Sequence, residues 1–173
     1  MQAAVHERYG SPDVVEVRDV GLPAVGDSDV LIRVRAASVN MSDWEVLRGR
    51  PLYARMQGPP RPRHPILGSD VAGVVERVGA AVERFRPGDE VLGDAMWHGA
   101  GTFAEYVSLP ADAPLVSKAH DLSFVVAAAL PQSGVIATQG LERVGPGSEV
   151  MINGAGAVRA PWRCSWPETP EGS

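Results

Sequence analysis

Glycine and proline interrupt this chain at short intervals, and this spacing limits what it can fold into. The 173 residues include 19 glycines and 15 prolines, and the segments between them are short and rich in valine. Such segments favour strands joined by tight turns, because glycine and proline suit turns and interrupt helices. The spacing therefore predicts a β-rich domain of the barrel or sandwich kind.

The clearest strand is expected at residues 29–37, where apolar and charged side chains alternate. Val30, Ile32, Val34 and Ala36 would lie on one face of this strand and the arginines on the other, because successive strand residues point to opposite faces. Further strands are expected at residues 2–6, 14–20, 66–79, 85–93, 102–109 and 115–118, the first two as a hairpin.

Three helices are expected among these strands. A short one would begin with Ser42 or Asp43 as its N-cap and end at Gly49, because these residue types favour helix ends. After residue 121 the sequence becomes rich in alanine and leucine, which predicts helices at 122–130 and 134–144. The predicted fold class is therefore mainly β with some α.

Charge and cysteine content exclude several classes of function. The net charge is −5 and no run of basic residues occurs, so nucleic acid is not an expected partner. No apolar stretch reaches the ~20 residues of a membrane span, and the first residues lack the pattern of a signal peptide. Cys164 is the single cysteine, which excludes an internal disulfide and a cysteine-rich zinc site. A cytoplasmic location is predicted, with no membrane association.

Residues 149–156 have the pattern that begins a dinucleotide-binding βαβ unit, a short apolar strand followed directly by glycines. Glycines at this turn let the backbone approach a pyrophosphate, whose charge then lies at the start of the next helix. Gly154, Ala155 and Gly156 are therefore the predicted cofactor-binding residues.

Four sequence blocks in a fixed order resemble the medium-chain dehydrogenase/reductase family: residues 29–40, 67–79, 87–91 and 129–134. The resemblance extends to Gly156, about nine-tenths of the chain. It implies a GroES-like catalytic domain, a partly open β-barrel, at 1–121, and the start of a Rossmann domain with only its first strand at 122–156. Members of this family transfer a hydride between NADP(H) or NAD(H) and a carbonyl, alcohol or activated alkene.

Two positions place the chain in the zinc-independent, quinone reductase-like branch of that family. Asn40 stands where zinc-dependent members have a ligating cysteine, and Ser69 stands where they have a histidine. Neither is a usual zinc ligand, and a catalytic zinc needs about three. The implied function is the NAD(P)H-dependent reduction of a small quinone, enone or aldehyde, with no bound metal.

The resemblance also implies where the site lies. Asn40 and Asp43 would lie near the nicotinamide, as catalytic residues, with Asn40 also binding the cofactor; Trp44, Tyr53 and Trp97 would line a flat apolar substrate pocket. Each position also has a structural interpretation: Asn40 as a turn residue, Asp43 as an N-cap, and the aromatic residues as packing.

Two loop histidines are weaker candidates. His64 and His98 lie in segments rich in proline or glycine, and either could donate a proton or simply be solvated.

The cofactor motif changes character after Gly156. Arg159 takes the place of the third glycine, and Pro161, Pro167 and Pro170 oppose a regular helix. We therefore interpret 157–173 as an aberrant or disordered tail. One hypothesis for its origin is a frameshift, because a neighbouring reading frame can encode a helix typical of the family.

The altered motif leads to three expectations for the chain itself. It would be a truncated member of its family, with weak NADPH binding and doubtful activity. Val150–Ile152 would have unpaired strand edges, which allows a homodimer. The alternative function, from another class, is a standalone GroES-like module with a non-catalytic binding or structural role.

Overall fold

The computed structural model describes residues 1–56, 58–142, 144–145 and 149–151. The chain divides into two compact units, Met1–Pro131 and Gln132–Ser173. The first unit contains both sheets and the predicted catalytic residues. The second contains nearly all of helix α3, Pro131–Leu141.

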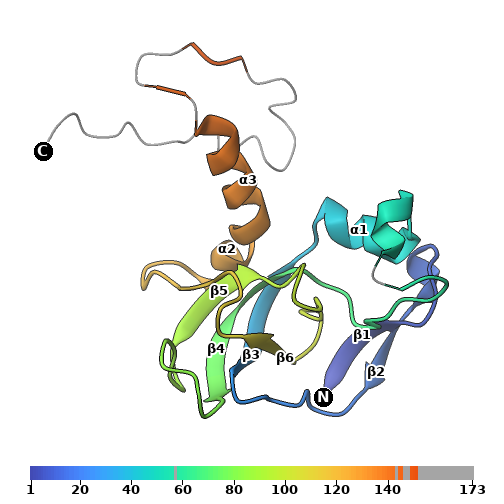
Figure 1. The fold of residues 1–173 in the computed structure, drawn as a ribbon, viewed down its shortest axis with the longest axis horizontal. Helices are drawn as coiled ribbons and strands as arrows, with labels where there is room; N and C mark the ends of the chain where they lie inside the picture. The colour runs from blue at the N-terminus through green and yellow to red at the C-terminus, as the bar shows by residue number, and fades with distance from the viewer. Residues whose placement is uncertain (57, 143, 146–148, 152–173) are drawn as a thin grey trace, which may run out of the picture. The chain divides into compact units, whose positions relative to one another are not determined.

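The first unit is built mainly of strands, which form a two-stranded and a five-stranded sheet (Figure 1). The strands are β1 (Gln2–His6), β2 (Val15–Asp19), β3 (Asp29–Ser38), β4 (Asp70–Val78), β5 (Glu90–Asp94), β6 (Tyr106–Pro110) and β7 (Leu115–Ser117). The helices are α1 (Met41–Arg48) and α2 (Phe124–Ala128), with the 3-10 turns η1 (Pro12–Val14) and η2 (Leu52–Arg55). The predicted fold class, mainly β with some α, is confirmed.

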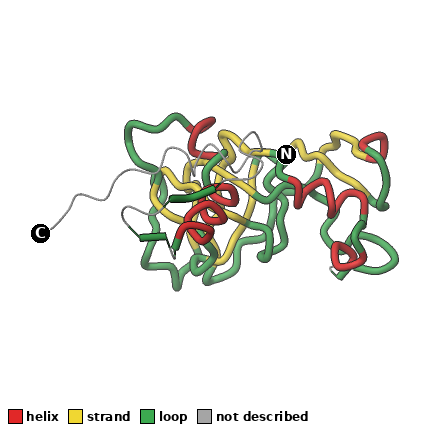
Figure 2. The backbone as a smooth tube through the Cα atoms, turned by 90° about the horizontal axis from the view of Figure 1, so that it is seen from above, coloured by secondary structure: helices red, strands yellow, loops and turns green. Residues whose placement is uncertain are grey.

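Strands β1 and β2 form the predicted antiparallel hairpin, in which Gln2 pairs with Asp19 and His6 with Val15. Figures 1 and 2 both place α1 and η2 beside this hairpin. A backbone hydrogen bond of 2.9 Å from Gly10 to Leu47 joins the hairpin turn to α1. The hairpin therefore supports the helix that carries the candidate site.

The five-stranded sheet has the order β6-β3-β4-β5-β7, and all its neighbouring strands are antiparallel. In the described part of the chain β6 and β7 do not pair with each other, so the sheet stays open. Its inner face buries the main apolar core, formed by residues of all five strands together with Phe85. At ~25 cal/mol per Å² of buried apolar surface, such a core is the dominant stabilising contribution.

The opposite face of the sheet is covered by α2. Ala127 and Ala128 of this helix pack with Ala72 and Leu92, and Ala36 lies against the same cluster. The sequence-based prediction that Ala36 shares a face with Val30 is therefore wrong. The register of β3 against β4 shifts between Val34 and Ala36, and such a bulge moves the following side chains to the other face.

The helix positions agree with the sequence in number but differ at their ends. The predicted helix at 122–130 corresponds to α2, which is about two residues shorter at each end, and the one at 134–144 corresponds to α3, which begins and ends about three residues earlier. The predicted boundary at residue 121 stays a prediction; the two compact units meet at residue 131.

Several sequence-based predictions concern residues that the structure does not describe. Gly154, Ala155, Gly156 and the whole of 157–173 lie outside the described residues. Of the predicted strand at 150–152, Val150 and Met151 are described and are not part of a strand. Within the described residues, no helix is both long and apolar enough to cross a membrane.

Candidate functional site

Asn40 lies between strand β3 and helix α1, directly before the first helical residue. Its φ and ψ of −109° and 166° are extended, and it forms a capping box with Asp43. The backbone N–H of Asn40 donates to Asp43 Oδ2 at 2.8 Å. Asn40, and not the predicted Ser42 or Asp43, is therefore the N-cap, because the extended backbone ends one residue before Met41.

A cluster of polar side chains surrounds this helix start. Asn40 Nδ2 donates to Ser69 Oγ at 3.2 Å and to Ser38 Oγ at 3.3 Å. The Ser69 hydroxyl donates to Asp43 Oδ2 at 3.3 Å, and the Ser38 hydroxyl donates to Asp70 Oδ2 at 3.0 Å. We call these five residues the Asn40 cluster. It joins the end of β3, the start of α1 and the start of β4.

The cluster is largely shielded from solvent. Ser69 and Asp70 are fully buried, Asp43 is 5% exposed, and Asn40 is half-buried. Burial raises the pKa of Asp43 to about 6, and the carboxylates of Asp70 and Asp94 also raise it. The hydrogen bonds from the Asn40 backbone and Ser69 act in the opposite direction. Asp43 therefore titrates in the range where many enzymatic acids and bases work.

A small cavity lies next to the cluster. Asp43 and Val46 of α1 line it, together with side chains of residues 64–68 and with Met96 and Ala100. Its volume of about 10 Å³ is enough for roughly one water molecule. Gly68, at φ +105°, forms part of the wall, and a Cβ there would lie 2.3 Å from Thr102 Oγ1. Glycine is therefore required at the approach to the cluster.

The structure brings together only some of the predicted site residues. Asn40 and Asp43 are in direct contact. Trp44 is 41% exposed beneath the Arg48 guanidinium, and Tyr53 donates its hydroxyl hydrogen to Glu45. Trp97 is 80% exposed. None of these three aromatic residues lines the cavity beside Asp43, so a substrate pocket formed by them stays a prediction.

The two loop histidines differ in position. His64 lines the cavity beside Asp43, and its ring lies near Gly99. His98 is not among the lining residues. The structure thus favours His64 over His98 as a group close to the Asn40 cluster.

Sequence reasoning missed Ser38 and Asp70 as members of the cluster. Asp70 offered a signal, since a carboxylate at the head of a valine- and alanine-rich strand needs a polar partner when buried. Ser38 offered none, because its partner lies 32 residues away in the chain.

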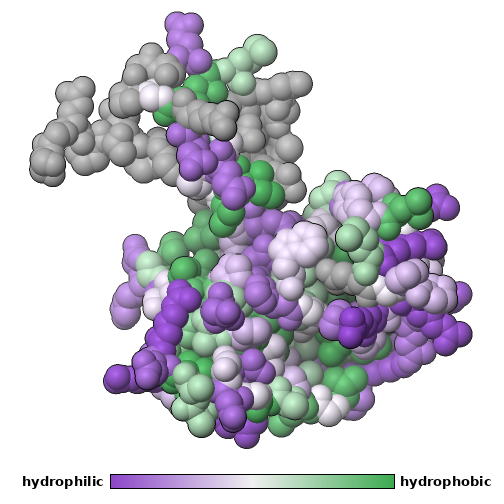
Figure 3. Space-filling view, viewed as in Figure 1, coloured by the Kyte–Doolittle hydropathy of each residue, from purple (hydrophilic) through white to green (hydrophobic). Residues whose placement is uncertain are grey.

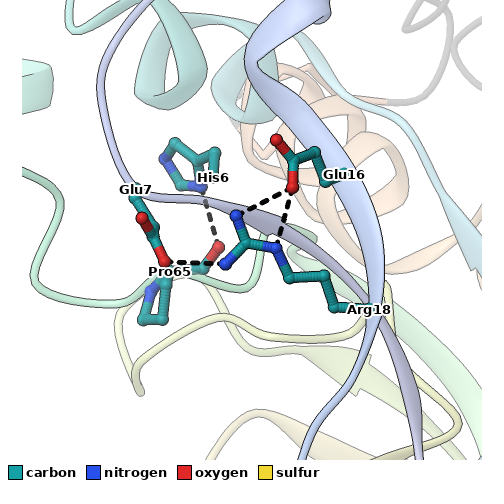
Figure 4. A network of polar contacts seen from close by, with 5 residues as sticks. All are labelled: His6, Glu7, Glu16, Arg18 and Pro65. Carbon is teal, nitrogen blue, oxygen red and sulfur yellow. Dashed lines mark hydrogen bonds and ion pairs between the residues drawn. The ribbon is translucent and has the colours of Figure 1, made fainter.

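A second polar network lies on the β1–β2 hairpin (Figure 4). Arg18 forms ion pairs with Glu7 at 2.7 Å and Glu16 at 2.8 Å, and His6 Nδ1 lies 2.9 Å from the Pro65 carbonyl. A larger cavity, of about 260 Å³, borders this network. Its lining is mostly charged, and Figure 3 shows that this edge of the molecule is predominantly hydrophilic. Because exposed ion pairs contribute little, we regard this network as a solvated surface.

The described residues include only some of those predicted to bind a cofactor. They contain no group of three or more His, Cys, Asp or Glu side chains placed to hold a metal ion. Asn40 is half-buried at the head of α1. The glycines expected to hold a pyrophosphate lie outside the described residues.

Comparison with known proteins gives a consistent set of relatives. A family model described as the alcohol dehydrogenase GroES-like domain matches residues 26–121. The chain is 36% identical over 169 residues to a 2-methylene-furan-3-one reductase from Solanum lycopersicum. This alignment covers 91% of this chain and 42% of that protein. The chain is 33% identical over 168 residues to a chloroplastic NADPH-dependent alkenal/one oxidoreductase from Arabidopsis thaliana, with the same coverage.

A solved structure agrees with these sequence matches. The quinone oxidoreductase of Pseudomonas syringae aligns with a TM-score of 0.80 at 31% identity, over 94% of this chain and 48% of that one. The chain thus spans less than half the length of these relatives.

Proposed function

We propose that this chain, which belongs to the medium-chain dehydrogenase/reductase family through its alcohol dehydrogenase GroES-like domain, provides the catalytic-domain side of a zinc-independent, NADPH-dependent reductase. The substrate class is a small quinone, enone or aldehyde. Relatives named as a quinone oxidoreductase and as an NADPH-dependent alkenal/one oxidoreductase support this choice.

The contact between Asn40 and Ser69 carries the zinc-independent part of the proposal. These are the two positions at which the family resemblance expects a cysteine and a histidine to bind zinc. Here they are joined to each other by a hydrogen bond of 3.2 Å, and Ser69 is tied in turn to Asp43. An amide and a hydroxyl are poor zinc ligands, and the hydrogens of the Asn40 amide and of the Ser69 hydroxyl are already engaged.

The cofactor would supply a hydride, and the chain would position the reacting groups. Asn40 and Asp43 are our candidates at the nicotinamide end, and Trp44, Tyr53 and Trp97 are candidates for the substrate side. The pyrophosphate would depend on Gly154, Ala155 and Gly156. Arg159 in place of the third glycine opposes close helix–strand packing there, so we propose that this chain by itself binds NADPH weakly and turns over slowly.

Location and assembly follow as secondary proposals. The acidic net charge and the single cysteine, which forms no disulfide framework, support the proposal of a cytoplasmic protein. Pairing through residues 150–152 would give a homodimer. Size-exclusion chromatography with light scattering checks the second proposal, and a monomer at all concentrations contradicts it.

The test combines metal analysis with reduction assays on the 173-residue chain. We expect less than about one-tenth of a zinc per chain after purification without chelator, and slow oxidation of NADPH by a benzoquinone or a linear enone, unaffected by EDTA. The matched control is Asn40→Cys with Ser69→His, which places a thiolate and an imidazole beside the Asp43 carboxylate, about the three ligands that a catalytic zinc needs, and should gain zinc. Stoichiometric zinc in the natural chain contradicts the proposal. A stable fold that neither binds nor oxidises NADPH favours the non-catalytic module.

A further inference from the structure

Both hydrogens of the Asn40 carboxamide are used inside the cluster. Nδ2 lies 3.3 Å from Ser38 Oγ and 3.2 Å from Ser69 Oγ, and it donates to both. A primary amide nitrogen carries two hydrogens and cannot accept. These two contacts therefore leave Asn40 without a donor for any ligand.

The two hydroxyls determine which end of the carboxamide faces inward. Ser38 donates to Asp70 at 3.0 Å, and Ser69 donates to Asp43 at 3.3 Å. A hydroxyl has one hydrogen, and an ionised carboxylate only accepts. Each hydroxyl can therefore only accept from Asn40, so the amide atom beside them must be the nitrogen. A reversed carboxamide would place three oxygens together with no hydrogen between them.

The carbonyl oxygen Oδ1 remains as the polar group that Asn40 can offer. One of its lone pairs serves the capping box, where it meets the backbone N–H of Asp43. A carbonyl oxygen has a second lone pair, and Asn40 is only half-buried. Oδ1 can therefore accept one further hydrogen bond from outside the cluster.

We propose that Asn40 binds the nicotinamide end of the cofactor as a hydrogen-bond acceptor, through Oδ1, and does not polarise the substrate oxygen. Asp43 and Asp70 are positioning residues, which act through Ser69 and Ser38. The proposal rests on the proposed function, because a nicotinamide nucleotide offers suitable donors in its carboxamide N–H and its ribose O–H groups. Polarisation of the substrate oxygen then falls to a group other than Asn40, since it requires a donor.

The ionisation of Asp43 determines whether the Ser69 hydroxyl must donate to it. The carboxylates of Asp70 on β4 and Asp94 on β5 act on it, and His64 lines the cavity on its other side. Together with burial, the two carboxylates raise its pKa to about 6. Once protonated, Asp43 can donate to Ser69, whose own hydrogen is then released. The Ser69 hydroxyl is therefore restricted to accepting from Asn40 only above that pH.

The first test is hydrogen exchange of the Asn40 side chain in the ligand-free chain, followed by nitrogen-15 NMR. The chain has two asparagines, so assignment is direct. At pH 7.5 both amide protons should exchange at least about tenfold more slowly than those of the exposed Gln139. Ser69→Ala should release one proton and Ser38→Ala the other. Exchange as fast as that of Gln139 in the natural chain overturns the proposal.

The second test identifies the donor on the cofactor. NADPH and its 3-acetylpyridine analogue, which lacks the carboxamide N–H, are titrated by NMR up to millimolar concentration. Asn40→Ser keeps a good N-cap but lacks the carbonyl. If Asn40→Ser binds NADPH at least about fivefold more weakly than the natural chain but binds the analogue with unchanged affinity, the donor is the carboxamide N–H. An equal loss for both assigns it to the ribose.

NADPH affinity unchanged by Asn40→Ser, or an Asn40 side-chain resonance unmoved by NADPH, overturns the proposal. Failure of the proposed function is distinguishable from this result. In that case the amide protons stay protected and NADPH shifts the Asn40 resonance, but neither a quinone nor an enone is reduced.

Discussion

The first unit buries one group of apolar side chains and one group of polar side chains. The two groups differ in how strictly they restrict the residue at each position. The apolar core brings together residues of all five strands, such as Ile32, Leu109 and Leu115. Dispersion and hydrophobic contacts are non-directional, so these side chains need only volume and shape. In the Asn40 cluster each donor has a particular acceptor at 2.8–3.3 Å. The core can tolerate exchange between apolar side chains of similar volume, whereas the cluster requires a donor or an acceptor at each position.

The comparison is tested first where the largest effect is expected, in the core. Leu109→Ala removes a fully buried side chain, and we expect a loss of about 3 kcal/mol in the free energy of unfolding, from lost burial and the cavity left behind. Urea denaturation measures it. The control is Val116→Ala, since Val116 is 51% exposed and should change stability by less than about 0.5 kcal/mol. Similar losses for both variants would contradict the assigned core.

The second prediction concerns the acceptor at the centre of the cluster. Asp43→Ala leaves the Asn40 N–H and the Ser69 hydroxyl without their acceptor, and we expect a loss of about 2 kcal/mol. Asp43→Asn keeps an oxygen acceptor and removes a desolvated charge, so it should cost less than half as much. If both variants lose the same stability, acceptor geometry is not what the cluster requires.

The third prediction separates the charge of Asp43 from its geometry. Its pKa is about 6 in the folded chain, above the usual 3.8 of an aspartate side chain. The folded state therefore holds this proton more tightly, and its contribution to stability is present below pH ~4 and is lost as the pH rises to ~6. The natural chain should lose about 1.4 kcal/mol per pH unit over that range relative to Asp43→Asn, and nothing further above it. A difference that stays constant from pH 4 to 8 would show that Asp43 is not desolvated as described.

The smallest loss of stability is expected at Ser123, the exposed N-cap of α2. Ser123 accepts a hydrogen bond of 3.2 Å from the backbone N–H of Val126, at the start of α2. Ser123→Ala should cost about 0.5–1 kcal/mol, because water can replace the lost acceptor. A loss equal to that of Asp43→Ala would mean that burial adds nothing to the capping contact of α1.

Much of the fold could be predicted from local patterns. Alternation along residues 29–37 identified β3, and glycine at position 49 identified the end of α1, where the backbone is left-handed at φ +58°. These predictions succeeded because strand alternation and helix termination depend on residues close in the chain. The prediction for Ala36 was wrong because the bulge in β3 arises from its pairing with β4, which is distant in the chain.

The sequence by itself determined the family and the β-rich fold, because these rest on blocks and spacings of a few residues. Only the tertiary structure decided that Ser69, 29 residues from Asn40 and 26 from Asp43, connects them. It also decided that Asp70 and Ser38 complete the cluster and that His64, not His98, lies beside it. The physical reason is that a hydrogen bond requires atoms within about 3.5 Å in a given direction. Chain folding sets that condition, and local sequence does not encode it.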